Sequence, residues 1–161
     1  LKNDSKAIEI VGKFKKLLIY SVNERYNEYV PLNEEFQFLT QYCEIEKLRY
    51  SKNSKIDYQF INKSSENPKI IPWLLHCYIE NAFKHSIKAS IQENKISIQC
   101  FYENKTLTLT VINSFENKIS VPVGLGMQNS KKRLTLAYPN KHSIQHWDND
   151  GEFTVKLIIE L

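Results

Sequence analysis

The sequence predicts a two-layer α+β sandwich preceded by an N-terminal helical segment. Of the 161 residues, 42% are hydrophobic and 25% are charged, which is ordinary for one domain with a core. Some segments show helical spacing of apolar residues, and others alternate between apolar and polar residues as half-buried strands do. Helices and antiparallel strands in this mixture pack in two layers. The helical segments are 5–22, 34–50, 71–87 and 128–138, the strands are 55–62, 95–103 and 106–113, and residues 142–160 form a hairpin.

Residues at the ends of these segments support the assignments. Ser5 and Asn33 precede the first two helices, where a side-chain oxygen can cap free backbone N–H groups. Pro72 falls in the first turn of the third helix, where a missing N–H costs nothing. Asn104-Lys105 and Asp150-Gly151 stand between strands as tight turns.

Charge and cysteine content exclude several classes of protein. The net charge of +4 is spread along the chain, which argues against nucleic acid as a partner. The three cysteines (Cys43, Cys77 and Cys100) have no metal-ligand spacing and fit reduced thiols in the cytosol. The sequence contains no run of eighteen apolar residues, so we expect no membrane span in it, and we expect no signal peptide. The chain starts without methionine, so we expect a piece of a longer protein.

The third helix carries polar residues beside its apolar face. Leu75, Tyr78, Ile79 and Ala82 share the face expected to pack on the sheet. Cys77, Asn81, Lys84, His85 and Lys88 share another. An amide oxygen suits Mg²⁺ and a lysine suits phosphate. Taken alone, however, this segment is better interpreted as a solvated helix face with a Glu80–Lys84 ion pair.

Two further stretches have the character of a ligand site. Asn113 follows Leu107, Leu109 and Val111 on the core-facing side of the predicted strand. A buried amide needs a hydrogen-bond partner, which either a ligand or a turn could provide. Taken alone, the turn is the preferred interpretation. Residues 114–127 have no periodicity and are predicted to be a mobile lid. They include two of only four glycines, which let backbone N–H groups approach an anion at a helix start.

Together, in this order, these stretches resemble the catalytic ATP-binding domain of sensor histidine kinases of the LytS/YehU-like branch. IPWLLHCYIENAFKHSI (71–87) is similar to its N-box and GLGMQNSKKRLTLAYPNKHSIQ (124–145) to its G-box. VPLNEEFQFLTQYCEIEKLRY (30–50) resembles the segment that links the phosphoacceptor and catalytic domains. The resemblance runs from about residue 7 to the end. It implies the Bergerat sandwich shared with gyrase, Hsp90 and MutL. It also implies that residues 1–30 are a remnant of the second helix of the dimerisation and phosphoacceptor hairpin, and that 31–161 are the catalytic domain.

The resemblance also assigns roles to residues. It implies that Asn81 is the Mg²⁺ ligand, that Glu80 polarises, positions or forms a surface ion pair, and that Lys84 and His85 contact phosphate or ribose. Asn113 stands where many of these kinases have the aspartate that accepts from adenine. Gly124 and Gly126 would hinge the lid, and Asn129 and Arg133 would follow in the adjoining helix.

The chain departs from the family pattern in two places. Residues 113–117 lack the aspartate and both glycines of the D-x-G-x-G box. All four histidines (His76, His85, His142 and His146) lie in the catalytic region, and none has the phosphoacceptor motif. The resemblance therefore implies ATP and Mg²⁺ as ligands, but a phosphoacceptor histidine outside this chain.

By this resemblance the chain is part of a protein histidine kinase. It would transfer the ATP γ-phosphoryl to that histidine, and from there to a response regulator, but would not be competent alone. The parent would be a homodimeric inner-membrane protein with this domain in the cytoplasm. One alternative is a degenerate Bergerat module that serves as a dimerisation or signalling scaffold, which the altered box favours. A second, an ATPase of the gyrase/Hsp90 type, is disfavoured by the kinase-like segment before the N-box.

Overall fold

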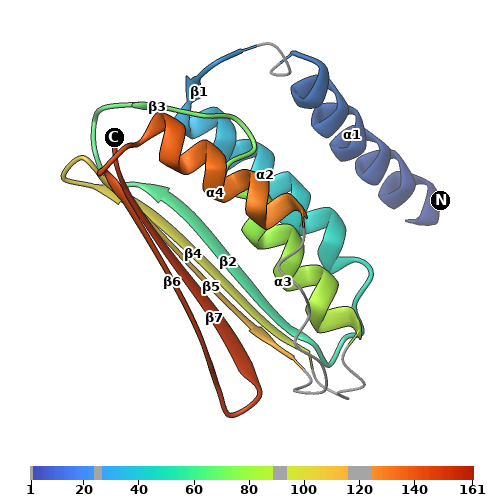
Figure 1. Cartoon of the computed structure of the whole chain (residues 1–161). Helices are drawn as coiled ribbons and strands as arrows, with labels where there is room; N and C mark the ends of the chain where they lie inside the picture. The colour runs from blue at the N-terminus through green and yellow to red at the C-terminus, as the bar shows by residue number, and fades with distance from the viewer. Residues whose placement is uncertain (1, 24–26, 89–93, 116–124) are drawn as a thin grey trace.

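The computed structural model describes residues 2–23, 27–88, 94–115 and 125–161. A five-stranded sheet has helices over one face, and a further N-terminal helix lies outside them (Figure 1). This confirms the predicted two-layer α+β sandwich behind a helical segment. The elements are α1 (Lys2–Asn23), β1 (Val30–Pro31), α2 (Leu32–Lys47), β2 (Lys55–Asn62), β3 (Lys69–Ile70), α3 (His76–Lys88), β4 (Lys95–Glu103), β5 (Thr106–Ser114), α4 (Leu125–Ala137), β6 (His142–Asn149) and β7 (Glu152–Glu160).

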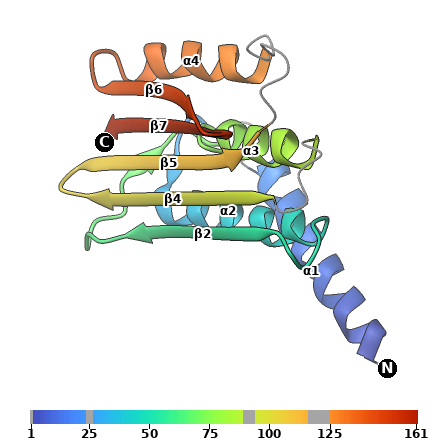
Figure 2. The same ribbon diagram turned by 90° about the horizontal axis from the view of Figure 1, so that it is seen from below.

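The large sheet is mixed. Its strand order is β2-β4-β5-β7-β6, with β2 parallel to β4 and the other neighbours antiparallel. Helices α2, α3 and α4 follow one another across one face, from the β2 edge toward β6 (Figure 2). The short strands β1 and β3 pair separately, and the sequence gives no periodic signal for either of these two-residue strands.

The core lies between the sheet and these helices. Alternation along β5 buries Leu107, Leu109 and Val111, as predicted. On β7 these residues pair with Ile159, Leu157 and Val155, so the two rows form one continuous apolar surface. Tyr78, Ile79 and Ala82 of α3 are buried against the sheet, and so is Leu75 in the turn before it, which confirms the predicted apolar face.

Two turns have the conformation that their residues favour. Asn104 and Lys105 have φ of 50° and 60°, and Asp150 and Gly151 have φ of 48° and 79°. Two successive residues with positive φ make a turn whose twist matches that of the flanking antiparallel strands. Both predicted hairpins are therefore present.

All four predicted helix starts differ from the structure. Helix α1 begins at Lys2, so Ser5 lies within it and does not precede it. Pro31, not Asn33, precedes α2 as its N-cap, because the Asn33 side chain instead accepts a hydrogen bond from Asn62 Nδ2 at 3.2 Å. Helix α3 begins at His76, so Pro72 lies in a preceding turn. Trp73 has φ of 66°, which no α-helix accommodates. Helix α4 begins at Leu125, three residues earlier than predicted.

Helix α1 packs on α2 along one side only. Leu17 and Tyr20 face the core, and Lys13 forms an ion pair with Glu44 at 3.0 Å. Another side of α1 bears apolar residues that are 47% to 73% exposed: Ile8, Val11, Phe14, Leu18, Ile19 and Val22. Among the described residues, no helix is long and apolar enough to cross a membrane.

Candidate functional site

The polar face of α3 is only partly exposed. Asn81 and His85 are half-buried, whereas Lys84 is exposed. Lys84 Nζ lies 2.5 Å from Glu80 Oε1, one turn away, so the ion pair considered from the sequence is formed. These two side chains are 60% and 36% exposed, and such surface pairs contribute little stability. Their charges nevertheless lie on the helical turn that carries the Asn81 amide.

Two serines join the C-terminal part of α3 to the end of β5. The hydroxyls of Ser86 and Ser114 are both buried and lie 3.3 Å apart. Ser114 Oγ also accepts from the Lys95 backbone N–H at 2.9 Å, which ties β5 to β4. His85 and Asn113 are the residues that precede these serines. The serine contact therefore brings two predicted site residues, from separate elements, to the same end of the sandwich.

Asn113 is a buried amide at that end. Its side chain is 3% exposed and is flanked in the sheet by Ile96 and Phe153. Asn113 Nδ2 donates to the Ser114 carbonyl at 3.0 Å. Within the described ranges, no group donates a hydrogen bond to Asn113 Oδ1. The oxygen is thus the atom of this amide able to accept from a ligand.

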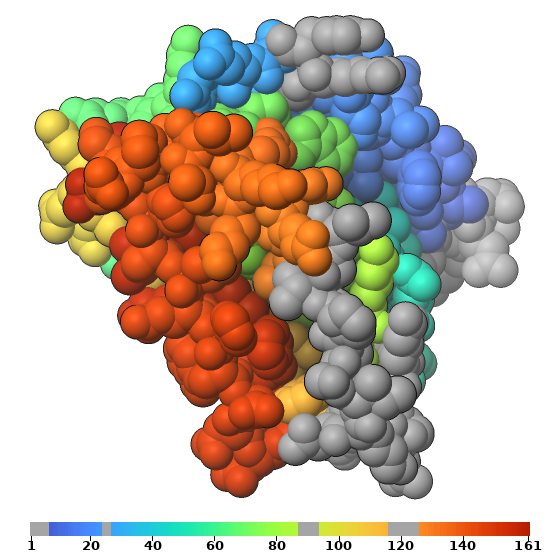
Figure 3. Space-filling model, in the orientation of Figure 1, coloured from blue at the N-terminus to red at the C-terminus, as the bar shows by residue number. Residues whose placement is uncertain are grey.

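Helix α4 packs beside the start of α3. Figure 3 shows α4 in orange next to the green residues that precede and begin α3. Ser130 Oγ is buried and donates to the Tyr78 hydroxyl at 3.1 Å. Arg133 Nη2 donates to the Pro72 carbonyl at 2.7 Å. Helix α4 is therefore joined to α3 through Ser130 and to the turn before α3 through Arg133, so the Arg133 guanidinium has a structural partner.

The remaining predicted residues lie near the start of α4. Gly126 and Asn129 are exposed, and a Cβ added at Gly126 meets nothing within 4 Å. Gly126 is helical rather than part of a loop, and Ser114 ends β5, so the predicted lid is shorter than 114–127. Gly124 and the rest of that lid, residues 116–124, lie outside the described residues.

The arrangement fits Mg²⁺ held together with phosphates. No group of three or more His, Cys, Asp or Glu side chains that could hold a metal occurs within the described ranges. Mg²⁺ commonly uses one or two protein oxygens and completes its shell with substrate phosphates and water. The half-buried Asn81 amide offers one such oxygen. The donor set therefore fits a metal that arrives with a nucleotide.

Cys77 lies on the same polar side of α3 but is not poised as a nucleophile. Burial raises the pKa of its thiol to about 11, against a lesser opposing effect of the hydrogen bond with Ser130. A thiol with this pKa is protonated at neutral pH, and only the thiolate is strongly nucleophilic. The structure therefore argues against covalent catalysis at Cys77.

Comparisons with known proteins find similarity to histidine kinases. The histidine kinase family model matches residues 1–54. The sensor protein LytS of Staphylococcus haemolyticus is 32% identical over 85 residues, which cover 53% of this chain and 14% of that protein. LytS of Staphylococcus epidermidis is 23% identical over 98% of this chain and 29% of its own length. The sensor histidine kinase BtsS of Escherichia coli is 24% identical over 75% of this chain and 22% of its own.

The chain is similar to LytS-like sensor histidine kinases. It spans less than a third of the length of these relatives. Solved structures agree on the fold. The nucleotide-free catalytic domain of histidine kinase ThkA has a TM-score of 0.55 at 19% identity, over 82% of this chain and 93% of that one. A blue-light activated histidine kinase domain from Erythrobacter litoralis has a TM-score of 0.59 at 13% identity. The match covers 82% of this chain and 66% of that one.

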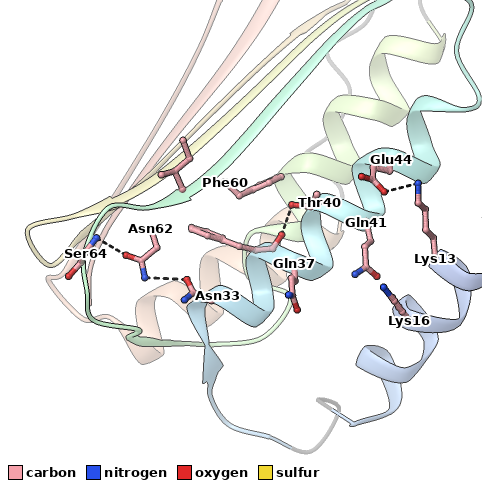
Figure 4. A pocket seen from close by; sticks show the side chains of 12 residues that line it. Lys13, Lys16, Asn33, Gln37, Thr40, Gln41, Glu44, Phe60, Asn62 and Ser64 are labelled. Atoms are coloured by element: carbon pink, nitrogen blue, oxygen red, sulfur yellow. Dashed lines mark hydrogen bonds and ion pairs between the residues drawn. The ribbon is translucent and has the colours of Figure 1, made fainter.

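The chain also has a cavity away from the predicted site. It measures about 690 Å³ and lies between α1, α2 and the C-terminal half of β2 (Figure 4). Lys13, Gln37, Gln41, Phe36 and Phe60 line parts of it. None of its lining residues is a predicted site residue, so this cavity is not the nucleotide pocket expected from the resemblance.

Sequence reasoning missed the buried polar groups that hold the site together. Ser86, Ser114 and Ser130 gave no signal, because serine is ordinary on helices and at strand ends. The sequence did contain a signal for Glu35, which is fully buried on α2. It follows Leu32 by three residues and precedes Leu39 by four, so a carboxylate interrupts an apolar stripe.

Proposed function

We propose that this chain is the ATP-binding catalytic domain of a two-component sensor histidine kinase. Its parent would transfer the ATP γ-phosphoryl to a histidine outside this chain, and then to a response regulator. The observation that carries the proposal is the buried Asn113 amide, whose oxygen receives no hydrogen bond from any described group, at the end of β5 that Ser86 ties to α3. Among the described residues, this oxygen is not one of the fully buried atoms without a partner, so it is open to an incoming donor, and the adenine amino group would supply one.

The polar face of α3 is proposed to hold the phosphates. Asn81 would bind Mg²⁺ through its amide oxygen, and the exposed Lys84 and half-buried His85 would contact phosphate or ribose. Glu80, which pairs with Lys84 at 2.5 Å, would set the position of that lysine. Gly124, Gly126, Asn129 and Arg133 are proposed to border the phosphates from the lid side. Phosphoryl transfer needs positioning and charge neutralisation rather than covalent catalysis. This division of roles agrees with the protonated thiol of Cys77.

The rest of the parent protein is proposed from the same family. Residues 1–30 would be the second helix of a dimerisation and phosphoacceptor hairpin, and residues 31–161 the catalytic domain. The exposed apolar stripe of α1 supports this division, because a helix that pairs within a bundle needs such a stripe. We expect the parent to be a homodimer anchored in the inner membrane, with this domain in the cytoplasm.

A non-catalytic scaffold is the second candidate. The observation that favours it is Asn113 itself, a neutral amide at the position of a charged adenine acceptor. A neutral hydrogen bond contributes about 1 kcal/mol, whereas a hydrogen bond to a charged group contributes about 1.5–3 kcal/mol. A weakened adenine site is what a module that no longer turns over ATP would retain.

Titration calorimetry with ATP, with and without Mg²⁺, separates the two candidates. The kinase proposal predicts Mg²⁺-dependent binding that weakens roughly fivefold or more in Asn113→Leu, because the substitution removes the acceptor. Gln99→Leu is the matched control, since it removes an exposed amide from β4. Equal ATP affinity of Asn113→Leu and the parent chain would favour the scaffold.

A further inference from the structure

A buried carboxylate links three segments of the chain at a distance from the predicted nucleotide site. Glu35 of α2 is fully buried. Its Oε2 atom accepts a hydrogen bond from the Tyr20 hydroxyl of α1. The same atom accepts from the backbone N–H of Trp73 at 3.3 Å. One oxygen therefore contacts both the N-terminal helix and the turn that begins α3.

Aromatic rings surround this contact. The Tyr20 ring stacks on Phe38 with centroids 4.5 Å apart and lies 5.6 Å from the Trp73 ring. Trp73 also packs edge-on against Phe38 at 4.6 Å and against His76 at 5.5 Å. The rings exclude water from the carboxylate, so Glu35 depends on its protein donors. Movement of Tyr20 would remove a donor from Glu35 and a ring contact from Trp73 at the same time.

Trp73 has a conformation that requires such support. Its φ of 66° lies in the left-handed region, which bulky residues rarely adopt. Such backbone persists only where the surroundings hold it. Trp73 stands three residues before His76, the first residue of α3. The conformation of Trp73 therefore sets the direction in which α3 begins, and with it the placement of the Asn81 turn.

We propose that Glu35 is a positioning residue that couples the placement of α1 to the start of α3, and through α3 to the nucleotide site. When α1 is docked, Tyr20 fixes the Glu35 carboxylate, which holds the Trp73 N–H and the first turn of α3. When α1 moves away, the carboxylate loses a donor and turns toward water, and the start of α3 is released. The effect on nucleotide binding rests on the proposed function, whereas the link between α1 and Trp73 does not.

Tyr20→Phe tests the coupling because it deletes the hydroxyl and keeps the stacked ring. Tyr42→Phe is the matched control. Tyr42 belongs to the same aromatic cluster, 6.5 Å from Phe38 and 4.5 Å from His76, and its hydroxyl forms no hydrogen bond within the described residues. Two quantities are measured in each variant. One is hydrogen exchange of the Trp73 backbone amide by NMR, and the other is ATP affinity by calorimetry in Mg²⁺.

We expect Tyr20→Phe to speed exchange at Trp73 roughly tenfold, because a Glu35 carboxylate that has lost the Tyr20 donor holds the Trp73 N–H less firmly. ATP affinity should weaken roughly fivefold, within the usual range of coupling between sites. Glu35→Gln should act in the same direction, and Tyr42→Phe should change neither quantity. Unchanged exchange at Trp73 in Tyr20→Phe would overturn the proposal. Faster exchange with unchanged ATP affinity would overturn the coupling to the site. If the parent chain bound no ATP, the proposed function would fail, and the exchange arm alone would decide the link from α1 to α3.

Discussion

The hydroxyl of Ser86 lies 3.3 Å from the hydroxyl of Ser114, and both side chains are buried. This contact joins α3 to β5 through two residues that are 28 positions apart in the chain. It also fixes the distance between the polar face of α3 and the Asn113 amide on the buried face of β5. The two halves of the predicted nucleotide site therefore depend on a pair of side chains that contact no ligand in the proposed function.

Ser114→Ala should lower the free energy of unfolding by about 1–3 kcal/mol, because it leaves the Lys95 backbone N–H without its acceptor. Urea denaturation measures the change. Ser143→Ala is the control, since that serine is exposed on β6. Equal stability of the two variants would show that the Ser114 hydroxyl is not needed to join β4, β5 and α3.

Asn81→Ala should abolish Mg²⁺-dependent ATP binding and leave the thermal midpoint nearly unchanged. The reason is that Asn81 is half-buried on the polar side of α3 and lies outside the apolar core. Calorimetry with and without Mg²⁺, together with thermal denaturation, checks both parts. A large loss of stability would instead identify Asn81 as a structural amide.

Asn113→Asp should tighten ATP binding modestly, because a charged acceptor binds the adenine amino group more strongly than a neutral one. Burial opposes the gain, since it raises the pKa of a carboxyl group and favours the neutral form. ATP and GTP titrations at pH 7 and pH 8 measure the balance. Weaker ATP binding at both values of pH would contradict adenine recognition at this position.

Arg133→Met should destabilise the fold by about 1–2 kcal/mol, because it removes the hydrogen bond to the Pro72 carbonyl and keeps an apolar stem. Lys132→Met, at the exposed neighbouring position of α4, is the control. Urea denaturation of both variants gives the comparison. If ATP affinity fell while stability did not, the main role of Arg133 would be at the phosphates.

Stability should fall on acidification from pH 7 to pH 5, in part through His76. Burial among aromatic rings lowers the pKa of His76 below 6.5. Between that lowered value and 6.5 the unfolded chain binds more protons than the folded chain, so acid favours unfolding. His76→Gln should reduce the loss in urea midpoint between the two pH values.

The periodicity of the sequence determined the helices, the strands of the large sheet and their buried faces. Leu107, Leu109, Val111 and Asn113 were assigned to one inner face by alternation, and all four are buried. The polar side of α3 followed from helical spacing in the same way. These features are local, because the side-chain direction repeats every two residues in a strand and every 3.6 in a helix. The resemblance to sensor histidine kinases also rested on motifs that are each continuous in the chain.

Only the tertiary structure decided which of these faces meet and through which atoms. The parallel pairing of β2 with β4, the contact of Ser86 with Ser114 and the link from Tyr20 through Glu35 to Trp73 all join residues that are distant in sequence. The left-handed conformation of Trp73 moved the start of α3 from the predicted Pro72 turn to His76. A sequence pattern gives the face on which a polar group lies. Its partner depends on how the elements pack, because a buried donor or acceptor is satisfied by whichever group packing brings within reach.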